Sequence, residues 1–133
     1  MSYGTSVTLG LPFADAADRV RAALAEQGFG VLTEIDVTAT LQARLGEQME
    51  DYLILGACNP PAAHQALVID RSIGLLLPCN VAIRATEAGT VIEAVDPLIM
   101  VELSGNAELK TIAEDAAARL ERVLASVAEP SAG

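Results

Sequence analysis

Residues 52–83, YLILGACNPPAAHQALVIDRSIGLLLPCNVAI, decide how the rest of the chain is organised. They contain both cysteines, the only histidine and the most apolar runs of the sequence. At 133 residues the chain is long enough to bury a sizeable core and short enough for one domain. No linker interrupts it, so we expect a single domain over residues 1–133, with a frayed tail from about residue 129.

A short pattern occurs twice in this stretch. The apolar run 52–57 leads into Cys58 and Asn59, and the run 73–78 leads into Cys79 and Asn80. A continuous apolar run of about four to eight residues, bounded by glycine and proline, is typical of a strand buried on both faces. We therefore expect two buried strands that each end in a Cys-Asn pair.

A short helix is expected between these two strands. The Asn59 side chain can accept a hydrogen bond from a free backbone N–H group, and a proline such as Pro60 suits the first helical position. The pair therefore predicts a helix over residues 61–69. On this helix His64 follows Cys58 by about one turn or more, close enough to face the same cavity.

Four segments of the chain, GFGVLTEIDVTATLQARLG, YLILGACNPPAAHQAL, IGLLLPCNVAIR and AVDPLIM, together span about residues 28–100. They resemble the DUF302 family of small bacterial and archaeal proteins. The resemblance implies a compact α+β domain that is usually a dimer, with no established biochemical function and no catalytic residues to carry over. Some members are encoded near sulfur-oxidation genes.

The remaining patterns predict the fold class. Two β-branched runs around a Gly89-containing turn indicate an antiparallel hairpin, which excludes a purely parallel sheet. We expect an α+β fold with one mixed or antiparallel sheet, helices mostly on one face, and a C-terminal amphipathic helix. The expected strands are 2–9, 30–35, 80–86 and 90–95, and the expected helices start near Phe13, after Asp36 and after Asn106.

Charge and hydropathy exclude two classes of partner. The chain has 8 basic against 18 acidic residues, a net charge of −10, and 3% aromatic residues, so it lacks the basic surface and stacking rings of a nucleic-acid binder. The uncharged stretch 52–69 is interrupted by two prolines and by Asn59 and His64, which disfavours a membrane span. The first ten residues lack a basic signal region, so we expect a cytoplasmic protein without membrane or nucleic-acid partners.

The candidate ligand-binding residues are the polar side chains that gather at the expected strand ends. Within this set, Cys58, His64 and Cys79 are candidate metal ligands, because thiolates and an imidazole suit copper(I), zinc or haem iron. Their spacing matches no zinc-binding or CxxC motif, so the metal and any cofactor stay open. The full set is Cys58, Asn59, His64, Cys79, Asn80 and Asp96.

Three functions compete. The favoured one is a non-enzymatic, dimeric module that binds a small ligand or a metal at the Cys-Asn strand ends. The second is a thiol-based sulfur-transfer or redox protein that uses Cys58 and Cys79, since the helix expected at Asn59 would stabilise a thiolate on Cys58. The third is a structural or interaction protein in which both cysteines only pack.

The expected partners follow from these functions. A second copy of the chain makes the homodimer, because 52% of the residues are hydrophobic and a domain of this size then tends to expose a large apolar patch. A small molecule or a sulfur-relay protein would be the further partner. In a reducing compartment we expect Cys58 and Cys79 to be free thiols near one cavity.

Overall fold

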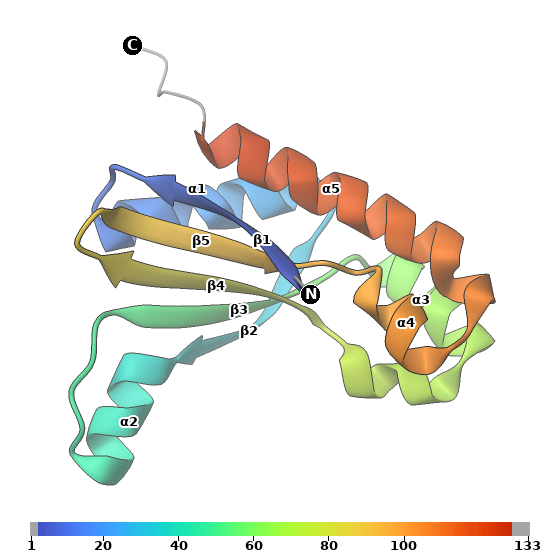
Figure 1. The fold of residues 1–133 in the computed structure, drawn as a ribbon, viewed down its shortest axis with the longest axis horizontal. Helices are drawn as coiled ribbons and strands as arrows, with labels where there is room; N and C mark the ends of the chain where they lie inside the picture. The colour runs from blue at the N-terminus through green and yellow to red at the C-terminus, as the bar shows by residue number, and fades with distance from the viewer. Residues whose placement is uncertain (1–2, 129–133) are drawn as a thin grey trace.

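The computed structural model of the chain describes residues 3–128, so the frayed tail predicted from about residue 129 lies outside the described residues. Figure 1 shows a sheet with long helices along one face and a group of short helices beyond one end. The elements in order are β1 (Gly4–Leu9), α1 (Phe13–Glu26), β2 (Gly30–Asp36), α2 (Val37–Leu45), β3 (Tyr52–Cys58), α3 (Pro60–Ile69), the 3₁₀ helix η1 (Arg71–Leu76), β4 (Cys79–Thr86), β5 (Gly89–Val95), α4 (Ile99–Ser104), the 3₁₀ helix η2 (Ala107–Leu109) and α5 (Lys110–Ala128).

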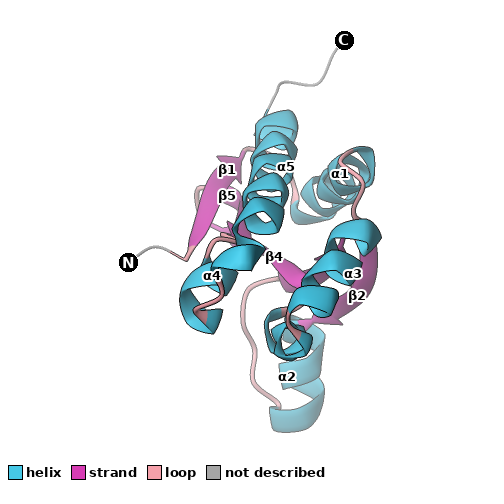
Figure 2. Ribbon diagram, turned by 90° about the vertical axis from the view of Figure 1, so that its right-hand side faces the viewer, coloured by secondary structure: helices cyan, strands magenta, loops and turns pink. Residues whose placement is uncertain are grey.

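The sheet has five strands in the order β1-β5-β4-β3-β2, and every neighbouring pair is antiparallel. Helices α1 and α5 contact each other and lie on one face of the sheet (Figure 2). The predicted α+β class with an antiparallel sheet and a C-terminal helix is therefore confirmed. No helix among residues 3–128 is long and apolar enough to cross a membrane.

Local capping signals fix several of the helix ends. The Asp36 carboxylate accepts a hydrogen bond from the Ala39 N–H at 2.9 Å, and α2 ends at Gly46 with a φ of 68°. After α1 the chain turns at Gly28, whose φ is 82°. The Asn106 side chain accepts from the Glu108 N–H and starts η2, which continues into α5.

The buried side chains form two hydrophobic clusters. The larger cluster lies between the sheet and the pair α1 and α5, and includes Val20, Leu55, Ile83 and Val123. The smaller cluster lies beyond the end of the sheet, where α3, η1 and α4 pack against α5 (Figure 1). Its buried members are Ala66, Ile73, Met100, Leu109 and Ala113.

The strand predicted over residues 73–78 is wrong. Most of this run forms η1, which Asp70 caps by accepting a hydrogen bond from the Ser72 N–H at 3.0 Å. The run buries Ile73 in the smaller cluster but leaves Leu75 87% exposed, so it does not behave as a strand covered on both sides. Pro78 precedes β4 and has no N–H group to donate to a ladder, and the strand begins only at Cys79.

The prediction that the run 52–57 is a strand buried on both faces is also wrong. The strand exists as β3, and Leu53, Leu55, Gly56 and Ala57 are buried, but Tyr52 and Ile54 are only half-buried. Tyr52 and Ile54 belong to the face of the sheet opposite α1 and α5. Figure 1 shows α2 projecting beside this open face at one end and η1 at the other.

Candidate functional site: a thiol-lined cavity

Strand pairing brings the two cysteines together. Ala57 is the Cα partner of Cys79, so Cys58, the last residue of β3, lies diagonally beside Cys79, the first residue of β4. Between them the chain leaves the sheet, forms α3 and η1, and returns. One cysteine therefore ends a strand and the other begins one, which corrects the prediction that both follow a strand.

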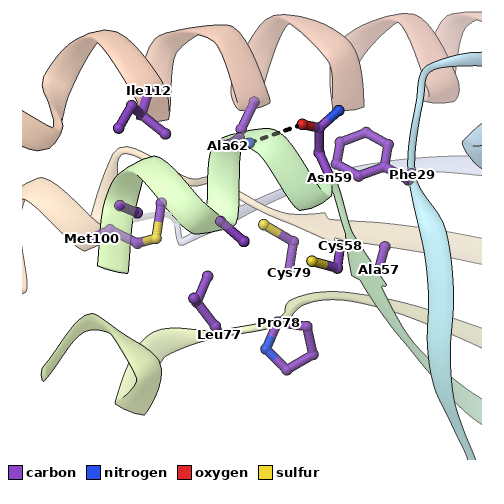
Figure 3. Close-up of a pocket in the computed structure, with 13 residues that line it drawn as sticks. Phe29, Ala57, Cys58, Asn59, Ala62, Leu77, Pro78, Cys79, Met100 and Ile112 are labelled. Atoms are coloured by element: carbon purple, nitrogen blue, oxygen red, sulfur yellow. Dashed lines mark hydrogen bonds between the residues drawn. The ribbon is translucent and has the colours of Figure 1, made fainter. Parts of the chain in front are cut away.

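Both cysteines line one cavity of about 40 Å³ at this end of the sheet. Such a volume holds only a few non-hydrogen atoms. Figure 3 shows both cysteine sulfurs pointing toward the middle of the lining side chains, with α3 and α5 above them. The lining residues are Phe29, Ala57, Cys58, Asn59, Ala62, Ala63, Ala66, Leu77, Pro78, Cys79, Met100, Ile112 and Ala116.

Gly56 lets one wall of the cavity approach the sheet. A Cβ atom at this position would lie 2.9 Å from Cγ of Pro78 and would also collide with Oγ1 of Thr33. Because real Cβ contacts are longer than this, only a glycine at position 56 lets Pro78 and Thr33 lie so close to β3.

Asn59 fixes the rim of the cavity. Its side-chain oxygen accepts a hydrogen bond from the Ala62 N–H at 3.1 Å, and its side-chain nitrogen donates to the Gly28 carbonyl at 3.1 Å. One residue earlier, the Gln27 carbonyl accepts a hydrogen bond of 2.8 Å from Arg119 of α5. These three bonds link α3, the α1–β2 turn and α5. The two that Asn59 makes engage both its side-chain oxygen and its side-chain nitrogen.

Burial and the neighbouring thiol together keep Cys79 protonated. Two causes raise the pKa of Cys79 from 9.0 to about 11: removal from water is the larger, and the charge of Cys58 is the smaller. Both thiols are free in the structure, and at neutral pH Cys79 is neutral.

Three predicted site residues lie outside the cavity. The cavity-lining positions of α3 are 62, 63 and 66, and His64 lies on another side of this helix, exposed. Asn80 follows Cys79 in β4, so its side chain lies on the opposite face of the sheet. The Asp96 carboxylate accepts a hydrogen bond from the Leu98 N–H at 3.0 Å in the turn before α4.

The predicted metal set of Cys58, His64 and Cys79 is therefore not assembled. No group of three or more histidine, cysteine, aspartate or glutamate residues within 3–128 is arranged to hold a metal ion. The structure instead adds a sulfur atom that sequence reasoning did not place, that of Met100 from α4. No sequence signal located it, because α4 itself was not predicted.

Fold and site together define a small α+β domain with a thiol-lined, mostly apolar cavity. The sequence pattern described as "Domain of unknown function DUF302" matches residues 5–127, and the chain belongs to this family. The crystal structure of an uncharacterized conserved protein DUF302 from Bacillus stearothermophilus is similar, with a TM-score of 0.89 and 28% sequence identity over 96% of this chain and 99% of that chain. No curated protein matches the chain.

Proposed function

We propose that this protein is a binding module for a small, apolar or soft ligand, and that the ligand occupies the cavity beside Cys58 and Cys79. The observation that carries the proposal is that thiols from two separate strands line one cavity whose other lining is almost entirely apolar. A small concave site with a few convergent polar groups is the usual form of a ligand site. The proposal places the protein in the reducing cytoplasm, where both thiols stay free.

Thiol-based sulfur transfer or redox sensing has less support. The nucleophile in such reactions is the thiolate, and a pKa of about 11 leaves Cys79 protonated at neutral pH. A purely structural role for the cysteines is the remaining alternative. It differs from the proposal in one measurable respect, since it requires no bound species in the cavity.

Filling the cavity should expel the ligand. Ala66 is 1% exposed and lines the cavity, so an Ala66→Leu substitution adds three carbon atoms where the ligand would lie. Native mass spectrometry of gently purified protein should detect a bound species in the wild type and lose it in this variant. The added volume should cost about 1–3 kcal/mol of stability, which a thermal melt checks.

The matched control is Ala43→Leu, the same change at an exposed position of α2. This control should retain the bound species in wild-type amount. A wild-type protein that carries no bound species, or a species that survives in Ala66→Leu, would favour the structural alternative.

We also propose that two copies pair through the open face of the sheet. This face bears a groove of about 550 Å³ lined by side chains such as Tyr52, Ile54 and Val95. Five strands spaced about 4.8 Å apart and about 20 Å long give a face of about 500 Å² in projection. With α2 beside it, such a face approaches the roughly 800 Å² per partner that a stable dimer buries.

Charge supports a second copy as the occupant of this face. The strand ladders place Arg84 and Glu93 on it, joined by an ion pair of 3.0 Å, so the face is locally neutral although the chain carries a net charge of −10. Around a twofold axis through the face, Arg84 of one copy can meet Glu93 of the other. Two copies that meet through this face therefore bring no excess of like charge together there.

Ile54→Lys should convert the dimer into a monomer, because the substitution places a cation in the middle of the open face. Light scattering after size-exclusion chromatography at micromolar concentration reports the mass. Val68→Lys is the control, since Val68 is an exposed apolar residue on α3, away from the sheet. A monomeric wild type, or an Ile54→Lys variant that stays dimeric, would contradict this interface.

A further inference from the structure

The cavity offers a ligand three sulfur atoms. Cys58 and Cys79 approach from the strands, and Met100 approaches from α4 on the opposite side (Figure 3). Among the described lining residues only Asn59 has a side-chain nitrogen or oxygen, and both are engaged with Ala62 and Gly28. The side-chain atoms that can bind a ligand in this cavity are therefore the three sulfur atoms.

Sulfur ligands select a narrow class of metal ions. Calcium and magnesium require oxygen ligands, of which the lining side chains offer none that is unengaged. Zinc in proteins is almost always held by four ligands in a tetrahedron, and nitrogen, oxygen or thiolate donors fill it. Copper(I) is soft, and it combines thiolates with a thioether.

We propose that the cavity is a copper(I) site in which Sγ of Cys58, Sγ of Cys79 and Sδ of Met100 are the ligands. The inference rests on the proposed function and names the ligand of the same cavity. Methionine has three rotatable side-chain bonds, so the Met100 thioether can move to complete the coordination that the two strand-borne thiols begin.

The binding step is an exchange of one metal ion for two protons. Copper(I) forms a bond with each cysteine sulfur, each thiol loses its proton to solvent, and the Met100 sulfur donates a lone pair. No electron is transferred, so copper stays monovalent and the thiols stay reduced. The product carries one negative charge next to the start of α3, where the helix dipole favours an anion.

Two features of the protein favour capture of such a cation. The net charge of −10 raises the local concentration of cations around the chain. The reducing compartment in which both thiols stay free is also the one in which copper is kept monovalent.

Anaerobic titration with copper(I), in competition with a chromophoric copper(I) chelator such as bicinchoninate, tests the site. The wild type should bind one copper(I) per chain. Cys58→Ser and Cys79→Ser should each weaken binding at least about 100-fold, and Met100→Leu, a change of similar volume, should weaken it about 3- to 30-fold. Met49→Leu is the matched control and should bind like the wild type, because Met49 lies beside α2, outside the cavity.

Each outcome bears on the inference. Absence of stoichiometric binding, wild-type affinity in either serine variant, or wild-type affinity in Met100→Leu would overturn the three-sulfur site. If copper(I) does not bind while native mass spectrometry still detects another species that Ala66→Leu loses, the copper site fails and the binding function stands.

Discussion

Between pH 9 and pH 11 the wild-type protein should lose up to about 2–3 kcal/mol of stability relative to a Cys79→Ala variant. The cause is the raised pKa of the buried Cys79 thiol. Below pH 9 this thiol is protonated in both the folded and the unfolded chain, so its contribution to the stability of the folded state is fully present. As the pH passes from 9 to 11, the unfolded chain loses the proton while the folded chain retains it, and unfolding becomes more favourable.

Urea unfolding at several pH values from 8 to 11 measures this effect. Other groups also titrate in this range, so the decisive quantity is the difference between the wild type and Cys79→Ala at each pH. Cys58→Ala is the control, since it removes only the smaller cause of the shift and should keep most of the pH dependence. Parallel stability profiles for the wild type and Cys79→Ala would show that the thiol is not buried as described.

Gly89→Ala should cost about 2–4 kcal/mol of stability. Gly89 begins β5 with a φ of 137°, a conformation that residues with a Cβ rarely adopt. An added Cβ would also collide with the carbonyl oxygen of Leu9 in the neighbouring strand β1. Backbone atoms cannot rotate away as a side chain can, so β1 must shift along its pairing with β5.

Gly10→Ala provides the matched control for this substitution. Gly10 directly follows β1, and a Cβ built there meets no other atom within 4 Å. Its melting temperature should stay within a few degrees of the wild type, while that of Gly89→Ala falls markedly. Equal melting temperatures for the two variants would contradict the close approach of β5 to β1.

Most of the fold could be predicted because its signals are local. Asp36 and Asn59 cap their helices through their own side chains, and Gly46 ends α2 in a left-handed conformation, so nearby residues suffice to place these ends. The run 73–78 failed because apolar content does not distinguish a strand from a 3₁₀ turn. What decided it was the Asp70 cap and burial of Ile73 in the smaller cluster, which is a tertiary contact.

The site was predictable only in part, because tertiary contacts also decide which side chains meet in the cavity. The convergence of Cys58 and Cys79 follows from the antiparallel pairing of β3 and β4, and the two matching Cys-Asn pairs hinted at it. His64 was misplaced because a helix turns about 100° per residue, so a position beside Ala63 need not face the same cavity. Met100 could not be placed, since it enters the cavity from α4, far along the chain.

The division of the buried side chains into two clusters has a consequence for exchange of the proposed ligand. Phe29 and Cys79 pack with the larger cluster, whereas Ala66 and Met100 belong to the smaller one, so the cavity lies on the boundary between them. The smaller cluster contains no strand and fewer buried residues, and a local opening there costs less free energy than unfolding the sheet. The short helices can thus open locally while β3 and β4 keep both thiols in place. If the proposed ligand binds in the cavity, this local opening sets its residence time, which can then change without any change in the global stability of the protein.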